Sequence, residues 1–232
     1  MFPIKDTIRS RSFPAVTWLL ILVNAAVFLF EINLSPRGLN AFVQTFAIVP
    51  ARLDLANPLT WGPLLTHMFL HGGWLHIISN MWTLFIFGDN VEDRLGSFRF
   101  LIFYLIGGVL AGLAQALLTP GSTVPALGAS GAIAAVLGAY FFFFPHSRVI
   151  TFVPLFFLPW FVEIPAVIYL GFWFVSQLFS GVTSLAVAGG MALGGVAWWA
   201  HIGGFVAGLI LARPFAAGRR ARPFYLDEYY PW

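Results

Sequence analysis

Several windows of this sequence exceed the roughly 18 consecutive uncharged residues that mark a segment able to cross a lipid bilayer. Of the 232 residues, 59% are hydrophobic and only 9% are charged, whereas an ordinary soluble domain has roughly 25% charged residues. A soluble fold of this length could not bury so much apolar surface. The chain is therefore predicted to be an integral, multi-pass membrane protein whose solvent is the lipid bilayer.

The apolar runs predict an all-α fold, a bundle of six transmembrane helices. Their predicted ranges are 15–34, 74–88, 99–118, 130–144, 161–181 and 193–212. The second of these is preceded by an apolar segment that begins at Leu64. Residues 35–63 contain four prolines and no run of spanning length, so they are predicted to form a large, structured or surface-lying loop between the first two helices. We expect three parts: a cytoplasmic N-terminal segment (1–14), the membrane domain (15–212) and a cytoplasmic C-terminal tail (213–232).

The basic residues are distributed unevenly between the two sides of the predicted membrane domain. With six spans both termini share one side, and that side receives ten of the twelve lysines and arginines. The rule that basic residues stay inside then predicts cytoplasmic termini, in a cell membrane. The net charge of +3 therefore reflects membrane topology, and no nucleic-acid partner is expected. The ten residues are Lys5, Arg9, Arg11, Arg94, Arg99, Arg148, Arg213, Arg219, Arg220 and Arg222; the other two are Arg37 and Arg52.

The fourth predicted span is too short to cross the bilayer. From Ser130 to the residue before Pro145 it has 15 residues, or about 22 Å at the helical rise, against a hydrocarbon core of about 30 Å. Residues 120–129 contain two prolines and two glycines and cannot extend the helix. Irregular backbone at this depth is tolerated where it packs in protein or lines a water-filled cavity. The sequence thus predicts an aqueous pocket at Ser130.

Polar side chains from three spans fall near one depth in the outer half of the membrane. Ser130 lies about 22 Å above the inner end of its helix, and His76 and His201 lie about 18 Å above theirs. Asn80 is one turn below His76 on the same helix face. Buried polar groups in lipid are costly and need partners, so we expect these side chains to meet.

Each of these residues also has a structural interpretation when taken alone. A membrane serine commonly bonds its own helix, a membrane histidine commonly fills a packing role, and Asn80 could hold helices together. The joint pattern favours chemistry, because Ser130 stands between glycines at a helix start, where free N–H groups favour an oxyanion. Stripes of small residues on the fourth and sixth spans, including Gly131, Gly138, Gly204 and Gly208, would let the two backbones approach closely.

These groups suffice for nucleophilic catalysis by a serine. Ser130 would attack a carbonyl and His201 would accept the hydroxyl proton. The Ser130 N–H, His76 and Asn80 are candidate donors to the oxyanion. No carboxylate lies at the depth of His201 on the neighbouring second or fourth span, so a Ser–His dyad is predicted. No metal or other cofactor is expected.

At these motifs the chain resembles the rhomboid family of intramembrane serine proteases. The resemblance implies a dyad of Ser130 and His201, with His76 and Asn80 around the oxyanion. It also implies transmembrane protein substrates, cleaved in or near their membrane segments. One difference is that Trp61 is followed by Gly62, where many rhomboids have arginine. The matching segments are HMFLHGGWLHIISN (67–80, including His67, His71, His76 and Asn80), GDNVEDRLG (88–96), GASG (128–131) and AHIGGFVAG (200–208).

Three alternatives to a serine protease fit the sequence less well. His67 and His71 have a zinc-binding spacing, but no glutamate lies between them as in the H-E-x-x-H metalloproteases. A non-catalytic rhomboid-like protein that binds membrane clients would typically lack the serine or the histidine. A transporter is disfavoured because no inverted repeat is evident. The sequence leaves the oligomeric state open.

Overall fold

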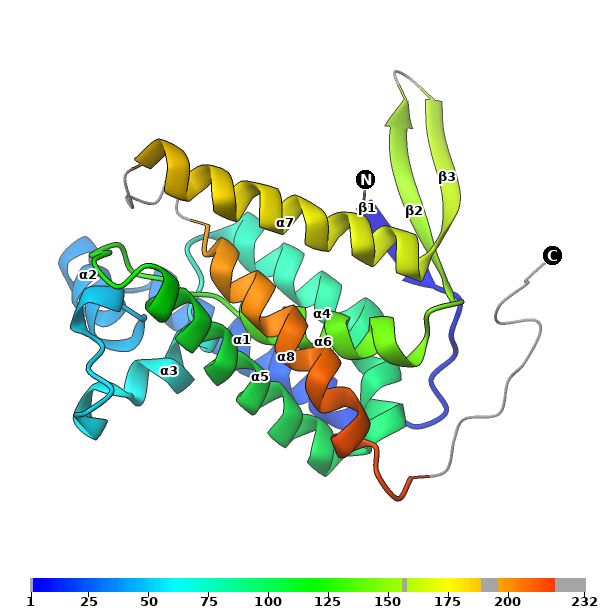
Figure 1. The fold of residues 1–232 in the computed structure, drawn as a ribbon, viewed down its shortest axis with the longest axis horizontal. Coiled ribbons are helices and arrows are strands. Elements are labelled where there is room, and N and C mark those ends of the chain that lie inside the picture. The colour runs from blue at the N-terminus through cyan, green and yellow to red at the C-terminus, as the bar shows by residue number, and fades with distance from the viewer. Residues whose placement is uncertain (1, 156–157, 189–195, 220–232) are drawn as a thin grey trace.

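The computed structural model describes residues 2–155, 158–188 and 196–219. These residues are mostly helical, and a helix overlaps each of the six predicted spans (Figure 1). The long helices are α1 (Ala15–Ile32), α4 (Trp74–Leu95), α5 (Ser97–Leu118), α6 (Ser130–Phe143), α7 (Ala166–Ala188) and α8 (Trp198–Phe215). Residues 193–195 of the last predicted span and residues 220–232 of the predicted tail lie outside the described residues.

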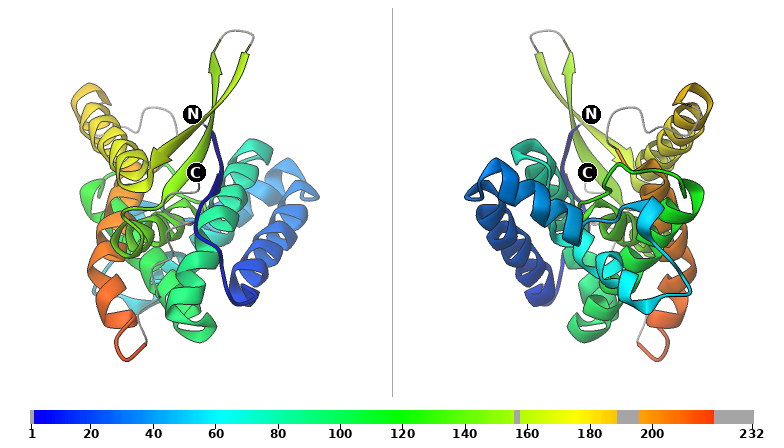
Figure 2. Two further views of the ribbon diagram at one scale, coloured as in Figure 1. Left: turned by 90° about the vertical axis from the view of Figure 1, so that its right-hand side faces the viewer. Right: turned by 90° about the vertical axis from the view of Figure 1, so that its left-hand side faces the viewer.

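Helix α6 forms the centre of the bundle. It packs against α4, α5 and α8, and every residue from Gly131 to Tyr140 is buried. Helix α1 packs on the outside of α4, and α7 lies along α8 at the edge of the bundle (Figures 1 and 2). A helix enclosed on all sides has no polar face to present, which is why α6 is apolar all round.

Within the described ranges, three helices are long and apolar enough to cross a membrane: Ala15–Ile32, Ser97–Leu118 and Ala166–Leu185. Helix α6 is equally apolar but has only 14 residues, or about 21 Å. Its start at Ser130 and its end before Pro145 agree with the short fourth span expected from the sequence. Residues 121–129, which precede it, are in turns and extended backbone.

The segment between α1 and α4 is more ordered than the loop expected from the sequence. It contains an 11-residue helix, α2 (Pro36–Phe46), a short helix, α3 (Gly62–Thr66), and the 3-10 turns η1 (Pro50–Arg52), η2 (Pro58–Thr60) and η3 (His67–Phe69). Main-chain hydrogen bonds pair Ile48 with Ala126 in both directions, at 3.0 and 2.7 Å. The Trp61 indole donates to the Asp54 carbonyl at 3.2 Å. The two bonds between Ile48 and Ala126 hold the segment against the loop that leads to Ser130, and the indole bond is internal to the segment.

The all-helical expectation was wrong at the end where α6 leads to α7. Strands β1 (Phe2–Asp6), β2 (Arg148–Leu155) and β3 (Leu158–Pro165) form an antiparallel sheet in the order β1-β2-β3. Residues 161–165, assigned above to the fifth span, therefore belong to β3, and the helix begins at Ala166. Hydropathy alone cannot distinguish a short apolar strand from a helix, although the β-branched and aromatic residues of 149–153 favour a strand.

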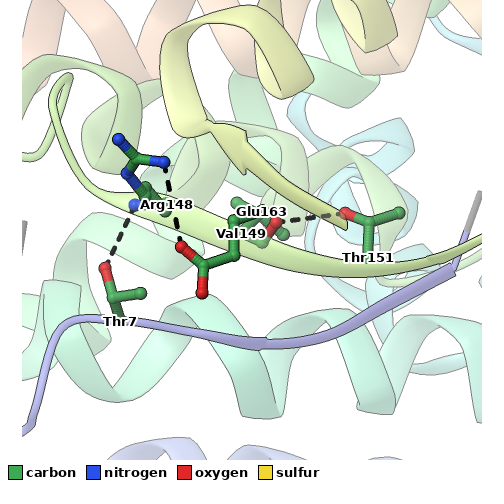
Figure 3. A network of polar contacts seen from close by, with 5 residues as sticks. All are labelled: Thr7, Arg148, Val149, Thr151 and Glu163. Atoms are coloured by element: carbon green, nitrogen blue, oxygen red, sulfur yellow. Dashed lines mark hydrogen bonds and ion pairs between the residues drawn. The ribbon is translucent and has the colours of Figure 1, made fainter. Parts of the chain in front are cut away.

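The sheet joins the N-terminus to the rest of the chain through polar contacts as well as backbone pairing. The Arg148 N–H donates to the Thr7 hydroxyl at 3.1 Å, and the Arg148 guanidinium lies 3.8 Å from Glu163 across the hairpin (Figure 3). The Thr151 hydroxyl donates to the Val149 carbonyl at 3.2 Å. The hairpin projects from the helical bundle beside the start of α7 (Figures 1 and 2).

Glu92, near the end of α4, caps the beginning of α1. Its carboxylate accepts from the N–H groups of Val16 at 3.0 Å and Thr17 at 2.8 Å, and from the hydroxyls of Thr17 at 2.8 Å and Ser97 at 2.6 Å. Glu92 is 1% exposed. A negative charge at a helix N-terminus satisfies free N–H groups and interacts favourably with the helix dipole. One side chain thus joins α1, α4 and α5.

Replacing Glu92 with alanine is expected to lower the free energy of unfolding by about 3 kcal/mol, because buried N–H groups lose a charged acceptor. Thermal denaturation in detergent micelles measures the effect. Asp93→Ala is the matched control, since that neighbouring carboxylate bonds exposed Ser12 and its loss should change stability by less than about 1 kcal/mol. Equal losses for the two variants would contradict the capping role.

Candidate active site

The first residue of α6 and the fourth residue of α8 meet through their side chains. The Ser130 hydroxyl oxygen and His201 Nε2 are 2.8 Å apart, a hydrogen-bond distance. Both residues are half-buried. The two positions are 71 residues apart in the chain, so it is the packing of α6 on α8 that brings them together.

Glycines bring α6 and α8 into backbone contact. A Cβ atom on Gly204 would lie 2.1 Å from the Gly131 carbonyl oxygen, and one on Gly208 would lie 2.0 Å from the Ala135 oxygen. From the other side, a Cβ on Gly138 would lie 2.2 Å from the Phe205 oxygen. No side chain larger than hydrogen fits at these places. The small stripes anticipated from the sequence are therefore the surfaces on which the two helices pack.

His76 lies over the loop that precedes Ser130. A Cβ on Gly128 would lie 2.7 Å from His76 Nε2 and 3.7 Å from the Ser130 hydroxyl oxygen. Gly128 has a φ of +126°, a region that favours glycine. The position thus requires glycine both for its backbone and for the room that the imidazole occupies. His76 Nε2 and the Ser130 hydroxyl consequently face the same small volume.

Asn80 lies one turn below His76 on α4. It is 6% exposed, and its side-chain Nδ2 is buried without a hydrogen-bond partner among the described residues. A buried donor without a partner is costly, and most native donors have one. The described residues therefore leave the donor capacity of the Asn80 amide unused.

The other two histidines of the motif make hydrogen bonds to the protein, His67 through its ring and His71 through its backbone N–H. The ring nitrogens of His71 are buried without a partner among the described residues. His67 Nδ1 lies 2.9 Å from the Pro63 carbonyl, and the His67 carbonyl accepts from the Gly128 N–H at 2.9 Å. The His71 N–H donates to the Glu31 carboxylate at 3.1 Å, which ties the start of α4 to α1. Among the described residues, no three His, Cys, Asp or Glu side chains are grouped closely enough to hold a metal ion.

The sequence analysis missed Gln177, which contacts the imidazole from α7. His201 Nδ1 and Gln177 Oε1 are 2.7 Å apart, and Gln177 is 6% exposed. A carboxylate is the usual third residue beside a serine and a histidine, so an amide in that place was not predicted. The signal in the sequence was that Gln177 is a polar residue within the apolar run 161–181. This predicted span runs antiparallel to the sixth span, which carries His201. The rings of Trp173 and Trp198 also flank His201, at centroid distances of 5.9 and 6.2 Å.

Comparison with known proteins gives a match over most of the chain. A family model for the rhomboid domain matches residues 58–217. This range includes every residue of the site described above.

Individual proteins match over shorter stretches. The chain is 33% identical over 132 residues to the putative rhomboid protease YdcA of Bacillus subtilis, covering 57% of this chain and 63% of that protein. It is 36% identical over 128 residues to the rhomboid protease GluP of the same organism, covering 54% and 24%. Identity to the chloroplastic Rhomboid-like protein 11 of Arabidopsis thaliana is 33% over 118 residues, covering 51% and 38%. The matches thus span less than two thirds of each of these relatives.

Proposed function

The chain belongs to the rhomboid family of integral membrane proteins, and from this premise we propose that it is an intramembrane serine endopeptidase. The observation that carries the proposal is the 2.8 Å contact between the Ser130 hydroxyl and His201 Nε2. A serine is a weak nucleophile unless an adjacent base accepts its proton. Ser130 attacks the carbonyl carbon of a peptide bond while its proton passes to His201. The imidazolium then returns that proton to the leaving amine, and water releases the acyl group by the same route.

The oxyanion that forms during this attack needs donors close to Ser130. The Ser130 N–H is free for this role because it lies at the first position of α6, where no carbonyl one turn earlier accepts it. The unpartnered amide of Asn80 is a second candidate. His76 Nδ1 accepts from the Gly72 N–H at 3.3 Å, so the neutral ring carries its proton on Nε2. His76 Nε2 and the Ser130 hydroxyl oxygen lie around the same point beside Gly128, so Nε2–H is a third candidate donor to the oxyanion.

Replacing Asn80 with alanine is expected to lower kcat by about 10²–10³-fold, because one donor to the oxyanion is lost, and His76→Ala should act similarly. Cleavage of a membrane substrate by the purified protein measures the loss. Asn24→Ala is the matched control, since Asn24 is also buried but donates to the Leu20 carbonyl of its own helix. Turnover that is unchanged in Asn80→Ala would make Asn80 a structural residue.

We propose that α4, α6 and α8 cross the membrane together with α1, α5 and α7, and that both termini are cytoplasmic in a cell membrane. Among the described residues, the basic side chains outside the 35–63 segment lie in the sheet, in the segment that precedes α1, and near the ends of α4, α5 and α8. This distribution supports the proposed orientation through the rule that basic residues stay inside. Because α6 has only 14 residues, a helix that ends at the inner surface begins below the outer surface, and Ser130 at its start lies at that depth. A protease accessibility assay on sealed vesicles tests the orientation.

The substrates proposed are transmembrane proteins that enter from the lipid beside α7. A cavity of about 180 Å³ lies between α4 and α7, with Trp82 and Thr83 on one side and Tyr169 and Trp173 on the other. Trp173 also flanks His201. The lining is largely apolar, which suits a membrane segment more than a soluble peptide.

A non-catalytic, client-binding role is the alternative to proteolysis. Labelling by a fluorophosphonate probe separates the two, because the probe reacts with an activated serine and leaves an ordinary serine unmodified. The parent protein should be labelled and cleave a membrane substrate. Absence of both reactions in folded protein would leave the client-binding role.

A further inference from the structure

Gln177 is the polar residue of α7 that faces the dyad. Its Oε1 lies 2.7 Å from His201 Nδ1, the ring nitrogen that does not face Ser130. The contact is buried, since Gln177 is 6% exposed. Both nitrogens of the imidazole are thus engaged, one by the nucleophile and one by an amide from a different helix.

The surroundings of Gln177 fix which end of its amide faces the histidine. Gln177 Nε2 lies 3.3 Å from the Trp173 carbonyl oxygen and 3.0 Å from the Ser176 hydroxyl. A backbone carbonyl can only accept, so the group that faces it must be the NH₂. The amide oxygen consequently faces His201, and it too can only accept.

The tautomer of His201 follows from that orientation. Because Gln177 Oε1 is an acceptor, Nδ1 must carry the hydrogen. In a neutral imidazole the other nitrogen then has a free lone pair. That nitrogen, Nε2, is the one that faces the Ser130 hydroxyl. The Trp173 carbonyl therefore determines, through Gln177, that His201 can act as a base toward Ser130.

We infer that Gln177 is a positioning residue that holds His201 in the tautomer able to accept the Ser130 proton. It occupies the place that a carboxylate has in Ser-His-Asp triads, but as a neutral acceptor. The inference rests on the proposed serine protease function. It also implies that the base depends on where α7 lies, since Gln177 is on α7 while Ser130 is on α6 and His201 on α8.

The kinetic test compares Gln177→Leu, which keeps the volume but has no acceptor, with Gln177→Glu, which keeps an acceptor oxygen. Gln177→Leu should lower kcat about tenfold with KM unchanged, because the loss of one neutral hydrogen bond lets the Nε2–H tautomer compete. Gln177→Glu should retain most of the parent kcat. Equal kcat values in the parent and the leucine variant would overturn the inference, as would equal losses in both variants.

A second measurement reads the tautomer directly and does not depend on turnover. The ¹⁵N chemical shifts of the His201 ring, assigned among the five histidines with a His201→Ala sample, distinguish Nδ1–H from Nε2–H. The parent and Gln177→Glu should show Nδ1–H, and Gln177→Leu should show a mixture or Nε2–H. A parent protein with Nε2–H would refute the inference even if it cleaves substrate.

Gln115 offers a matched control for the loss of a buried glutamine beside α8. Its Oε1 accepts from the Ala200 N–H at 3.2 Å, one residue from His201, without touching the ring. Gln115→Leu should leave the His201 tautomer unchanged, and a shift equal to that of Gln177→Leu would mean that general repacking is responsible. If the parent protein neither cleaves a substrate nor reacts with the fluorophosphonate probe, the proposed function fails. The ¹⁵N shifts of His201 still decide whether Gln177 sets its tautomer.

Discussion

Ser130→Ala is expected to abolish peptide-bond cleavage, with a fall in kcat on the order of 10⁶-fold, the scale seen when a soluble serine protease loses its nucleophile. The hydroxyl oxygen, which lies 2.8 Å from His201 Nε2, is the atom that forms the covalent bond, and alanine has no such oxygen. Folding should be unaffected, because the residue that replaces Ser130 is smaller and suits a helix. Cleavage of a reconstituted membrane substrate by purified protein measures the loss, and fluorophosphonate labelling should vanish with it.

His201→Ala should reduce cleavage by a similar factor, because the serine then keeps its proton. The two losses should not multiply in the double variant, since the side chains act as one unit. Thermal denaturation provides the control for folding in each case. Measurable cleavage after either single change, in protein free of host proteases, would refute the assignment of the dyad.

Gly204→Ala is expected to lower kcat by about 10²-fold although Gly204 takes no part in the chemistry. The added Cβ would lie 2.1 Å from the Gly131 oxygen, so α6 and α8 must separate by about 1 Å. A misplacement of that size at reacting groups costs about 10²-fold. Gly204 lies one turn from His201 and Gly131 is next to Ser130, so the separation falls where the hydroxyl and imidazole meet. Gly208→Ala, whose Cβ would lie 2.0 Å from the Ala135 oxygen, should act in the same way.

Gly171→Ala is the matched control for both glycine changes. Gly171 is also in a long apolar helix, α7, but a Cβ there meets nothing within 4 Å. It should retain the parent activity and stability, whereas Gly204→Ala should also lose about 1–3 kcal/mol of stability through overpacking. Full activity in Gly204→Ala would mean that the helices can separate without moving the dyad.

The sequence led to the site through composition, spacing and motif. Uncharged runs indicated helices in a membrane, and the prolines at 125 and 145 bounded the short helix that begins at Ser130. Counting residues along three helices placed Ser130, His76 and His201 near one depth, because helical rise is nearly constant. The small residues on α6 and α8 indicated a close approach. None of these patterns required knowledge of how distant parts of the chain pack.

Strand β3, helix α2 and the contact of Gln177 with His201 were not predicted from the sequence. The apolar residues of β3 continue into the apolar run of α7, so hydropathy did not separate the two, and it was pairing with β2 that made the first part a strand. Helix α2 lies in a segment rich in prolines, where hydropathy gave no spanning run. Gln177 was overlooked because a single amide in an apolar helix has no motif. Its partner is 24 residues away on another helix.

Sequence alone was enough to predict a membrane protein of mostly helical structure, and it gave the side chains that we propose for acyl transfer. These properties depend on local composition and on the fixed geometry of a helix. Tertiary structure decided which side chains touch: a hydroxyl with an imidazole, and that imidazole with an amide from α7. Contacts of this kind depend on how helices rotate and pack against one another, and no single segment of the sequence specifies that arrangement.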